Sequence, residues 1–578
     1  MLTSVVTIPS EAQDGPSLAK WTFLVYLDAD NNLEDAGVQD VNEMESIGST
    51  DDVNIIVQMD RIEEYDTTNG DWTGAMRFRA EKDEDTATMS SELLQDLGEV
   101  NMGDPEVAID FIEWGVENYP AERYALVFWD HGGAFRGVCY DDTVPGSDDY
   151  DMINMSDLHY VTESMYQIIG NRRVDLVGFD ACLMAQVAVL YEVKDYASVA
   201  VASGFNEPGD GWPYELVLGP LVNDPNMDEK ELAEIISETY IYSYNNRQED
   251  PQDYPMVTMA GFDMTKMDDV MLVLDQFSEE LASMGALGSL EYLTQIYLAR
   301  KNCNSYDAAS VFIYDMTGYP LYDVIDFTVE LEALILEAFP KNDLILDLCA
   351  RLRTAIGPGD GRFMFVSNAD QWHEDANGLS EYFPNKDAEG LTITQLPTTY
   401  SLVYEDTSFA REHLWDDFLH AFYGIDPIED SLPTISIKGP AFNTSFSYDE
   451  EVVTVWGVAY DREMVDSVEV RIDGGEWTTV PGISGQGKIP WIHTLDIAEL
   501  GPGSHIIEVR AVDRPQGSGE GVTGHVTAPV YTMVTVGTAP PEEDDGAIVP
   551  VWLVQVFAAL VIIGGIIFGA ILFKGRKG

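Results

Sequence analysis

Five apolar runs between residues 21 and 202 constrain the fold more than any other feature of the chain. They lack the alternation of polar and apolar residues that marks a strand with one exposed face, so each predicts a strand covered on both faces. The runs are residues 21–27, 53–59, 123–129, 174–179 and 197–202, and helix-length stretches lie at 32–47, 104–119, 156–169 and 183–196. This order predicts an α/β/α sandwich with a mostly parallel sheet.

The remaining soluble part divides into two regions. Residues 225–427 carry long helices with few strands and predict a mixed α+β continuation of the first region, 21–224. Residues 428–536 consist of short alternating segments separated by turn residues, which predicts a β-sandwich. The segments "VEVRIDGGEW" and "GSHIIEVRAVD" resemble immunoglobulin-like modules of microbial surface proteins.

The C-terminus predicts a membrane anchor. Residues 551–573 contain no charged side chain, and at about 1.5 Å per residue such a helix spans a hydrocarbon core of about 30 Å. We therefore expect a transmembrane helix at 549–573, and a basic tail at 574–578 that stays cytoplasmic and places the rest outside the cell. The acidic, Pro-containing segment 537–548 predicts a stalk, with the sandwich as a spacer.

The N-terminal segment, 1–20, does not match a signal peptide, because it has neither a basic start nor a long apolar stretch. Export then requires a start further upstream or an atypical route.

The charge of the chain excludes some partners. Its 578 residues include 102 acidic and 30 basic side chains, a formal net charge of −72. Such a surface repels nucleic-acid phosphate, so no nucleic-acid partner is expected, whereas cationic ligands are attracted. The four scattered cysteines form neither a disulfide framework nor a zinc motif. The sequence does not indicate the oligomeric state.

Two of the predicted strands end in reactive residues. His131 follows the strand at 123–129, and Cys182 follows the strand at 174–179. In one parallel sheet both would emerge at the same edge, where an imidazole can take the proton of a thiol nucleophile. Gly132 would leave its N–H unobstructed, so that this group and the N–H of Cys182 could bind an oxyanion. The alternative is a core cysteine beside an incidental histidine.

Three blocks at these strand ends, "WDHGGAF", "DACLMA" and "NEPGDGWPY", resemble the clostripain family of cysteine endopeptidases, in the caspase-like clan. Further blocks in the family order, from "LDADNNLE" to "WDDFLHAFY", extend the resemblance over residues 20–424. The resemblance implies a caspase-like fold, a dyad of His131 and Cys182, and an oxyanion hole completed by Gly132.

The resemblance also implies substrates, because the family typically cleaves proteins and peptides after Arg or Lys. The implied binding residues are Asp180 and Asp210, and a carboxylate does pair well with a guanidinium group. Asp180 could instead satisfy nearby backbone N–H groups, and Glu207 could replace Asp210. The leading hypothesis is thus a membrane-anchored, outward-facing endopeptidase with Arg or Lys specificity.

No cofactor is required by this chemistry, although some family members use calcium. Residues 28–39 depart from a calcium loop at Leu33 and Gln39, so we expect Asn31 or Asn32 to cap a helix instead. The acidic loop at 141–151 could hold calcium, but a solvated charge run is the preferred interpretation. No metal ligand is therefore predicted.

Other possibilities stay open. A catalytically inactive adhesion or scaffold protein on the same fold would explain the sandwich and stalk. A protease that prefers acidic residues is less favoured, because Asp180 and Asp210 would repel an acidic substrate. Cys139 is the one rival nucleophile. Some relatives are activated by self-cleavage between the histidine and the cysteine. Here only Arg136, Arg172 and Arg173 are basic in that interval, so we expect a single-chain enzyme.

Overall fold

The computed structural model describes residues 18–63, 65–85, 88–147, 149–246, 256–286, 290–306, 320–339, 342–384, 402–423, 434–440, 444–447, 452–475, 477–513 and 530–537. The chain divides into two compact units, residues 1–430 and 431–578, and each is described by itself. The predicted transmembrane helix at 549–573 lies outside the described residues. Within those residues, no helix combines the length and the apolar character needed to cross a bilayer.

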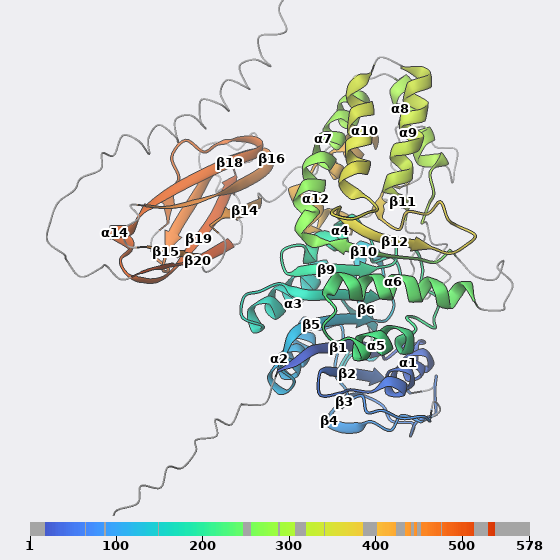
Figure 1. Ribbon diagram of the computed structural model, residues 1–578. Coiled ribbons are helices and arrows are strands. Elements are labelled where there is room, and N and C mark those ends of the chain that lie inside the picture. The colour runs from blue at the N-terminus through green and yellow to red at the C-terminus, as the bar shows by residue number, and fades with distance from the viewer. Residues whose placement is uncertain are drawn as a thin grey trace, which may run out of the picture. The chain divides into compact units, whose positions relative to one another are not determined.

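A nine-stranded sheet forms the centre of the first unit, in the order β12-β10-β9-β8-β5-β1-β2-β3-β4 (Figure 1). Its five middle strands are parallel, which confirms the mostly parallel sheet expected from the apolar runs. These strands are β9 (Ala197–Ala202), β8 (Val174–Asp180), β5 (Ala121–Trp129), β1 (Ala19–Ala29) and β2 (Val53–Arg61).

Two antiparallel strands extend the sheet at each edge. Beyond β2 lie β3 (Ala75–Arg79) and β4 (Glu92–Gly98), and beyond β9 lie β10 (Thr258–Asp263) and β12 (Met364–Ala369). The second predicted region, 225–427, thus contributes two strands to the main sheet rather than forming a separate core.

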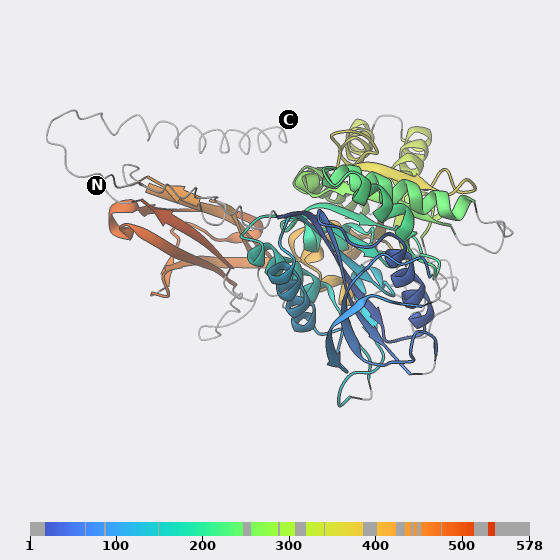
Figure 2. The same ribbon diagram turned by 60° about the horizontal axis from the view of Figure 1, so that its bottom comes forward.

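Helices cover both faces of the sheet (Figure 2). One face packs against α1 (Glu34–Ile47), α5 (Tyr214–Asn223) and α6 (Glu229–Asn245). The other packs against α2 (Pro105–Asn118), α3 (Met155–Ile168) and α4 (Val187–Val193). Along β1, Phe23 and Val25 face the first group and Leu24 and Tyr26 the second, so the strand is apolar throughout because both of its faces are covered.

The helix starts follow local capping chemistry. Asp104 accepts a hydrogen bond from the N–H of Glu106 (3.0 Å) and is followed by Pro105 at the first helical position of α2. Asn154 caps α3 in the same way. The predicted helix at 183–196 is shorter than expected, because Leu183 has a left-handed backbone (φ 67°) and α4 begins only at Val187.

A helical layer completes the first unit beside β10 and β12. The helix α7 packs on α10 and α13, and α8 packs on α9. These helices contribute to the same core as α2, α3 and α4. The remaining elements are η1 (Ala134–Arg136), β6 (Val138–Asp141), β7 (Asp151–Ile153), η2 (Met264–Lys266), α7 (Met267–Ala286), α8 (Leu290–Asn302), β11 (Leu321–Asp323), α9 (Val324–Ala338), α10 (Asp343–Ile356), β13 (Ser380–Tyr382), α11 (Leu402–Glu405), α12 (Ser408–Glu412) and α13 (Trp415–Tyr423).

The second unit is β-rich, as expected. Its long strand β16 (Val452–Ile472) pairs with β14 and β18 in its first half and with β17 and β19 in its second, with a register shift between Asp461 and Val465. The two halves enclose a core of their own. The other elements are β14 (Thr434–Gly439), β15 (Thr444–Phe446), β17 (Thr478–Thr479), β18 (Gly485–Asp496), α14 (Ile497–Leu500), β19 (Gly503–Asp513) and β20 (Val530–Val536).

Candidate active site

The ends of β5 and β8 bring the two predicted catalytic residues to the same edge of the sheet. These strands are parallel neighbours, with Trp129 paired to Asp180, and the N–H of Asp130 donates to the carbonyl of Asp180 (3.2 Å). His131 and Cys182 each lie two residues beyond the paired positions. Because neighbouring strands are about 4.8 Å apart, the two residues leave the sheet side by side, as the sequence predicted.

Gly132 lies against the backbone of Cys182. A Cβ atom at Gly132 would be 2.0 Å from the carbonyl oxygen of Cys182 and 2.8 Å from its nitrogen, so only glycine fits. The N–H groups of Gly132 and Glu207 both point at the Cys182 Sγ, the latter at 3.2 Å. Two backbone donors therefore surround the sulfur, and both favour its thiolate form.

Burial nevertheless dominates the titration of the thiol. Removal from water raises the pKa of Cys182 to about 11, although the N–H groups of Glu207 and Gly132 act in the opposite direction. The thiol is therefore protonated at neutral pH and needs a base at the moment of attack.

His131, which leaves the neighbouring strand, is the candidate for that base. Its Nε2 lies 2.9 Å from the Oδ1 of Asn32, and since that oxygen only accepts, we assign the proton to Nε2. Nδ1 is then the basic nitrogen. Burial lowers the pKa of His131 to about 4, so the imidazole is neutral near pH 7. Asn32 is thus the partner of the His131 ring, a contact that the sequence did not identify.

Cys139, the rival nucleophile, lies in the core. Its side chain is fully buried in β6, and burial raises its pKa well above the ordinary value. Because this sulfur is inaccessible while Cys182 is partly exposed, Cys139 is the weaker candidate nucleophile.

Asp180 is buried beneath the loop that follows β9. It is 4% exposed and accepts hydrogen bonds from the N–H of Trp212 (3.1 Å) and from the hydroxyl of Tyr214 (3.0 Å). Burial raises the pKa of Asp180 to about 7 in spite of these bonds. The carboxylate therefore accepts a hydrogen bond from a backbone N–H, as the structural interpretation of Asp180 predicted. It also lies two residues before Cys182, a position that is compatible with the substrate-binding interpretation.

Two further carboxylates gather around Asp180, and we call Asp40, Asp180 and Glu207 the Asp180 cluster. Burial and then repulsion from Asp180 raise the pKa of both Asp40 and Glu207 well above the ordinary range. A Cβ at Gly211 would be 2.9 Å from Asp180 Oδ1 and 3.2 Å from Asp40 Oδ2. The backbone of the 207–212 loop is thus pressed onto the cluster.

The remaining predicted binding residue, Asp210, lies on the exposed part of this loop. Its charge acts on Asp40, so it belongs to the same acidic surroundings at a more accessible position. Asp40 itself was not predicted. It comes from α1, where the Nε1 of Trp129 donates to its Oδ2 (2.6 Å).

A second group of acids lies at the same edge of the sheet. Asp30, Asp60 and Asp141 bring carboxylate oxygens within 4.8 Å of one another. Asn31 accepts the N–H of Leu33 (2.9 Å) in the turn before α1, but the expected cap by Asn31 or Asn32 is wrong, because Leu33 is the N-cap residue and no side chain caps the helix. The interpretation of residues 141–151 as a solvated charge run is wrong at Asp141, because that side chain is fully buried.

The close approach of Gly132 to Cys182 yields a direct prediction. We expect Gly132→Ala to lower kcat/KM by about 10² to 10³, the usual effect of losing one oxyanion donor, because the added Cβ forces the His131–Gly132 peptide away from Cys182. Initial rates on a peptide substrate would measure the loss, with circular dichroism to establish folding. Gly219→Ala, whose Cβ meets its nearest neighbour at 3.6 Å, is the matched control. Equal activity in both variants would contradict the assignment.

Several known proteins are similar to this chain. Clostripain of Hathewaya histolytica is 24% identical over 421 residues, covering 65% of this chain and 78% of the relative. A secreted C11 cysteine protease from Bacteroides thetaiotaomicron, solved with an irreversible peptide inhibitor, covers 64% of this chain and 95% of its own, with 17% identity and a TM-score of 0.44. An inactive zymogen C11 protease from Parabacteroides distasonis covers 70% and 99%, with 15% identity and a TM-score of 0.42.

Two family models match the chain. The model of bacterial Ig domains matches residues 433–509 in the second unit. The model of the clostripain family matches residues 25–333, more than half of the chain, and this stretch contains both His131 and Cys182. The chain therefore belongs to the clostripain family and is a cysteine peptidase.

Proposed function

We propose that this cysteine peptidase is an endopeptidase that hydrolyses the peptide bond following an Arg or Lys residue. The observation that carries the proposal is the Asp180 cluster, whose central member, Asp180, lies two residues before Cys182. The charged groups that act most strongly on Asp40 and Glu207 are other carboxylates, so a substrate cation would relieve their repulsion. A guanidinium or ammonium group is the matching partner.

In the proposed reaction, the substrate cation binds at the Asp180 cluster and places the following carbonyl carbon beside Cys182. The Nδ1 of His131 takes the thiol proton as the sulfur attacks, and the N–H groups of Gly132 and Cys182 bind the oxyanion. His131 then returns the proton to the leaving amine as the C–N bond breaks. Water, deprotonated by His131, hydrolyses the thioester and restores the thiol.

We also propose that the enzyme acts at a cell surface as a membrane-anchored protein with its C-terminus in the cytoplasm. The support is the sequence at 549–573 and the basic tail at 574–578. The immunoglobulin-like unit and the segment 537–548 would then hold the peptidase away from the membrane.

Action as one uncut chain is part of the same proposal. Arg172 forms an ion pair with Asp175 (2.8 Å), and Arg173 donates to the carbonyls of Lys194 and Ala197. Both are fixed at the start of β8, at the other end of the strand from Cys182, so neither residue is presented as a cleavage site.

A panel of fluorogenic peptides that differ only in the residue before the cleaved bond tests this function. We expect kcat/KM to be at least about 10²-fold higher for Arg and Lys than for the uncharged citrulline, because leaving one member of a buried charge pair without its partner costs about 3–5 kcal/mol. An Asp peptide should not be cleaved measurably. Equal rates on all four peptides would contradict the proposed specificity, and no turnover of any peptide would favour the inactive scaffold.

A further inference from the structure

The carboxyl group of Glu207 is the least satisfied of the Asp180 cluster. Both of its oxygens are buried without a hydrogen bond of normal geometry, although the N–H of Ala181 lies near them. The residue as a whole is nevertheless partly exposed, whereas Asp40 and Asp180 are 2% and 4% exposed. Its backbone N–H donates to the Sγ of Cys182 (3.2 Å). Glu207 therefore links the buried cluster to the candidate nucleophile.

The contact between Glu207 and Asp180 requires a proton. Their side chains lie within hydrogen-bonding reach of each other, but two carboxylates would both only accept. Asp180 already accepts from the N–H of Trp212 (3.1 Å) and from the hydroxyl of Tyr214 (3.0 Å), and both bonds favour its ionised form. Glu207 accepts no such bond of normal geometry. The proton therefore belongs to Glu207, whose O–H donates to the Asp180 carboxylate.

The charged surroundings of Glu207 also favour its neutral form. From the end of β8, from α5 and from α6, the titratable groups that interact with its carboxyl group are Asp180, Cys182, Tyr214 and Tyr240. Each of them becomes negative when it ionises, and Asp40 of α1 adds a further acid beside Asp180. Burial and then repulsion from Asp180 accordingly raise the pKa of Glu207 well above its ordinary value.

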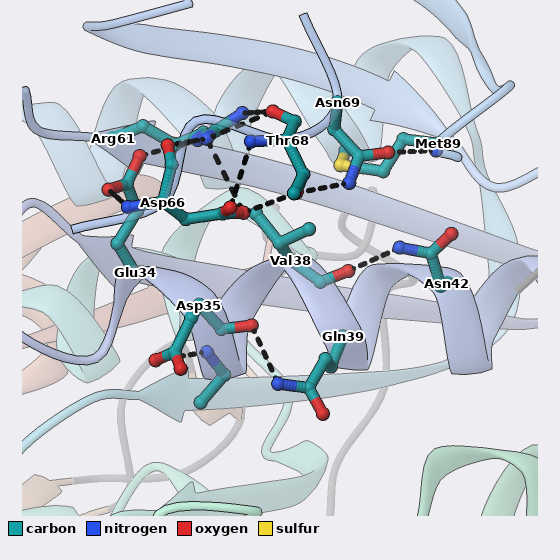
Figure 3. Close-up of polar contacts among 11 residues, drawn as sticks. Glu34, Asp35, Val38, Gln39, Asn42, Arg61, Asp66, Thr68, Asn69 and Met89 are labelled. Carbon is teal, nitrogen blue, oxygen red and sulfur yellow. Dashed lines mark hydrogen bonds and ion pairs between the residues drawn. The ribbon is translucent and has the colours of Figure 1, made fainter. Parts of the chain in front are cut away.

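In the described part of the chain, no basic side chain is among the groups that act most strongly on Asp180 or Glu207. Arg61 does contact α1, but its side chain turns toward the start of this helix and the loop at 66–68 (Figure 3). Its Nε donates to the Glu34 carboxylate (2.8 Å), and both partners of this ion pair are fully buried. The charge of Arg61 is thus compensated there and does not serve the Asp180 cluster.

From these contacts we infer that Glu207 is a specificity-determining residue that acts as a neutral carboxylic acid. Its O–H donates to the Asp180 carboxylate, and its carbonyl oxygen accepts a hydrogen bond from the cationic side chain of the substrate. The negative charge that pairs with this cation stays on Asp180. The inference rests on the proposed cleavage after Arg or Lys, and it adds a directional contact from an uncharged group.

Two substitutions at Glu207 separate a neutral acid from a carboxylate. Glu207→Gln keeps one donor and one acceptor, so kcat/KM for an Arg peptide should stay within about threefold of the parent. Glu207→Leu removes both and should lower kcat/KM by about 10- to 100-fold, the loss expected for a hydrogen bond to a charged group. Most of this loss should appear in KM. Glu238→Leu, an exposed position on α6, is the control and should keep the parent rate.

The pH profile adds a measurement that a merely structural role would not change. The hydrogen bond from Glu207 lowers the pKa of Asp180. The rise in kcat/KM that accompanies ionisation of Asp180 should therefore move to higher pH in Glu207→Leu and stay in place in Glu207→Gln. An equal loss of activity in both variants would show that the negative charge of Glu207 is needed, and full activity in both would show that it has no role. Either result would overturn the inference.

Infrared spectra of the full chain carrying Cys182→Ala test the protonation directly. At about pH 8 an ordinary glutamic acid is ionised, whereas a neutral Glu207 contributes the C=O stretching band of a protonated carboxyl group. This band should weaken when Glu207→Gln is added to the same chain, and an unchanged band would overturn the inference. Because this protein is inactive, the result does not depend on peptide specificity. Equal cleavage of Arg and citrulline peptides by the active parent would instead refute the proposed specificity, and with it the substrate contact of Glu207.

Discussion

Cys182→Ala is expected to reduce peptide hydrolysis by about 10⁴-fold or more, the scale seen when a nucleophile is removed from a working constellation. The backbone N–H groups of Gly132 and Glu207 both point at this sulfur. Without the thiol, the proposed proton transfer to His131 cannot generate a nucleophile. Single-turnover kinetics on an Arg peptide would measure the loss. The alanine leaves the surrounding backbone contacts in place, so the melting temperature should change little.

Cys139→Ala is the matched control for this result. Cys139 lies eight residues after His131 but is fully buried in the core, so its removal should leave kcat unchanged within a few fold. Labelling with an arginyl chloromethylketone provides an independent measurement, because peptide mapping reports which sulfur is modified. Modification at Cys139, or substantial turnover by Cys182→Ala, would refute the proposed nucleophile.

The sequence predicted the parallel sheet and the meeting of His131 with Cys182 for one physical reason. A strand buried on both faces carries no alternation, and the five runs share that property. Parallel strands also end at a common edge, so two reactive residues that follow two such strands converge. By contrast, β4 has half-exposed and exposed side chains, and no comparable pattern marks it.

The parts of the site that were not predicted depend on contacts between distant segments. Asp40 lies on α1, where a charged residue ordinarily faces solvent. It is buried because the loop around Gly211 packs over it. Asn32 was expected only to cap a helix, and its contact with His131 depends on how β1 and β5 are paired.

The buried acids Asp30, Asp60 and Asp141 illustrate the same limit. Considered as a continuous loop, residues 28–39 do not match a calcium-binding motif. The fold instead brings these three acids together from the residue after β1, from β2 and from β6, and a search for local spacing cannot find such a group. An acidic group made by the sheet register becomes visible only when the register is known.

Asp180→Asn is expected to lower kcat/KM for Arg peptides by about 10³-fold, because losing one member of a buried charge pair costs about 3–5 kcal/mol. Most of the change should appear in KM, since the interaction exists in the bound substrate as well as in the transition state. A citrulline peptide, which has nearly the shape of arginine without its charge, should be cleaved about as well by the variant as by the parent. Asp224→Asn, an exposed acid far along the chain, is the control.

The pKa of Asp180 sets the direction in which kcat/KM for Arg peptides should change with pH. Burial raises the pKa of Asp180 to about 7, so the carboxyl group is neutral below that pH and negative above it. The parent kcat/KM for Arg peptides, which reports the free enzyme, should therefore rise with pH through about 7. The bound cation holds the carboxylate ionised, so kcat should not show this step. The step should shrink in Asp180→Asn and be absent with citrulline.

A loss of activity in Asp180→Asn has a second possible cause in this structure, and the kinetic data on Arg and citrulline peptides distinguish the two causes. Asp180 holds the loop after β9 through Trp212 and Tyr214, so its loss could act by releasing that loop rather than by removing a charge. A released loop would impair Arg and citrulline peptides equally, would lower kcat along with kcat/KM, and would leave the pH step in place. Selective loss with Arg therefore requires that the carboxylate contact the substrate cation, whereas equal loss would assign Asp180 to the support of the loop alone.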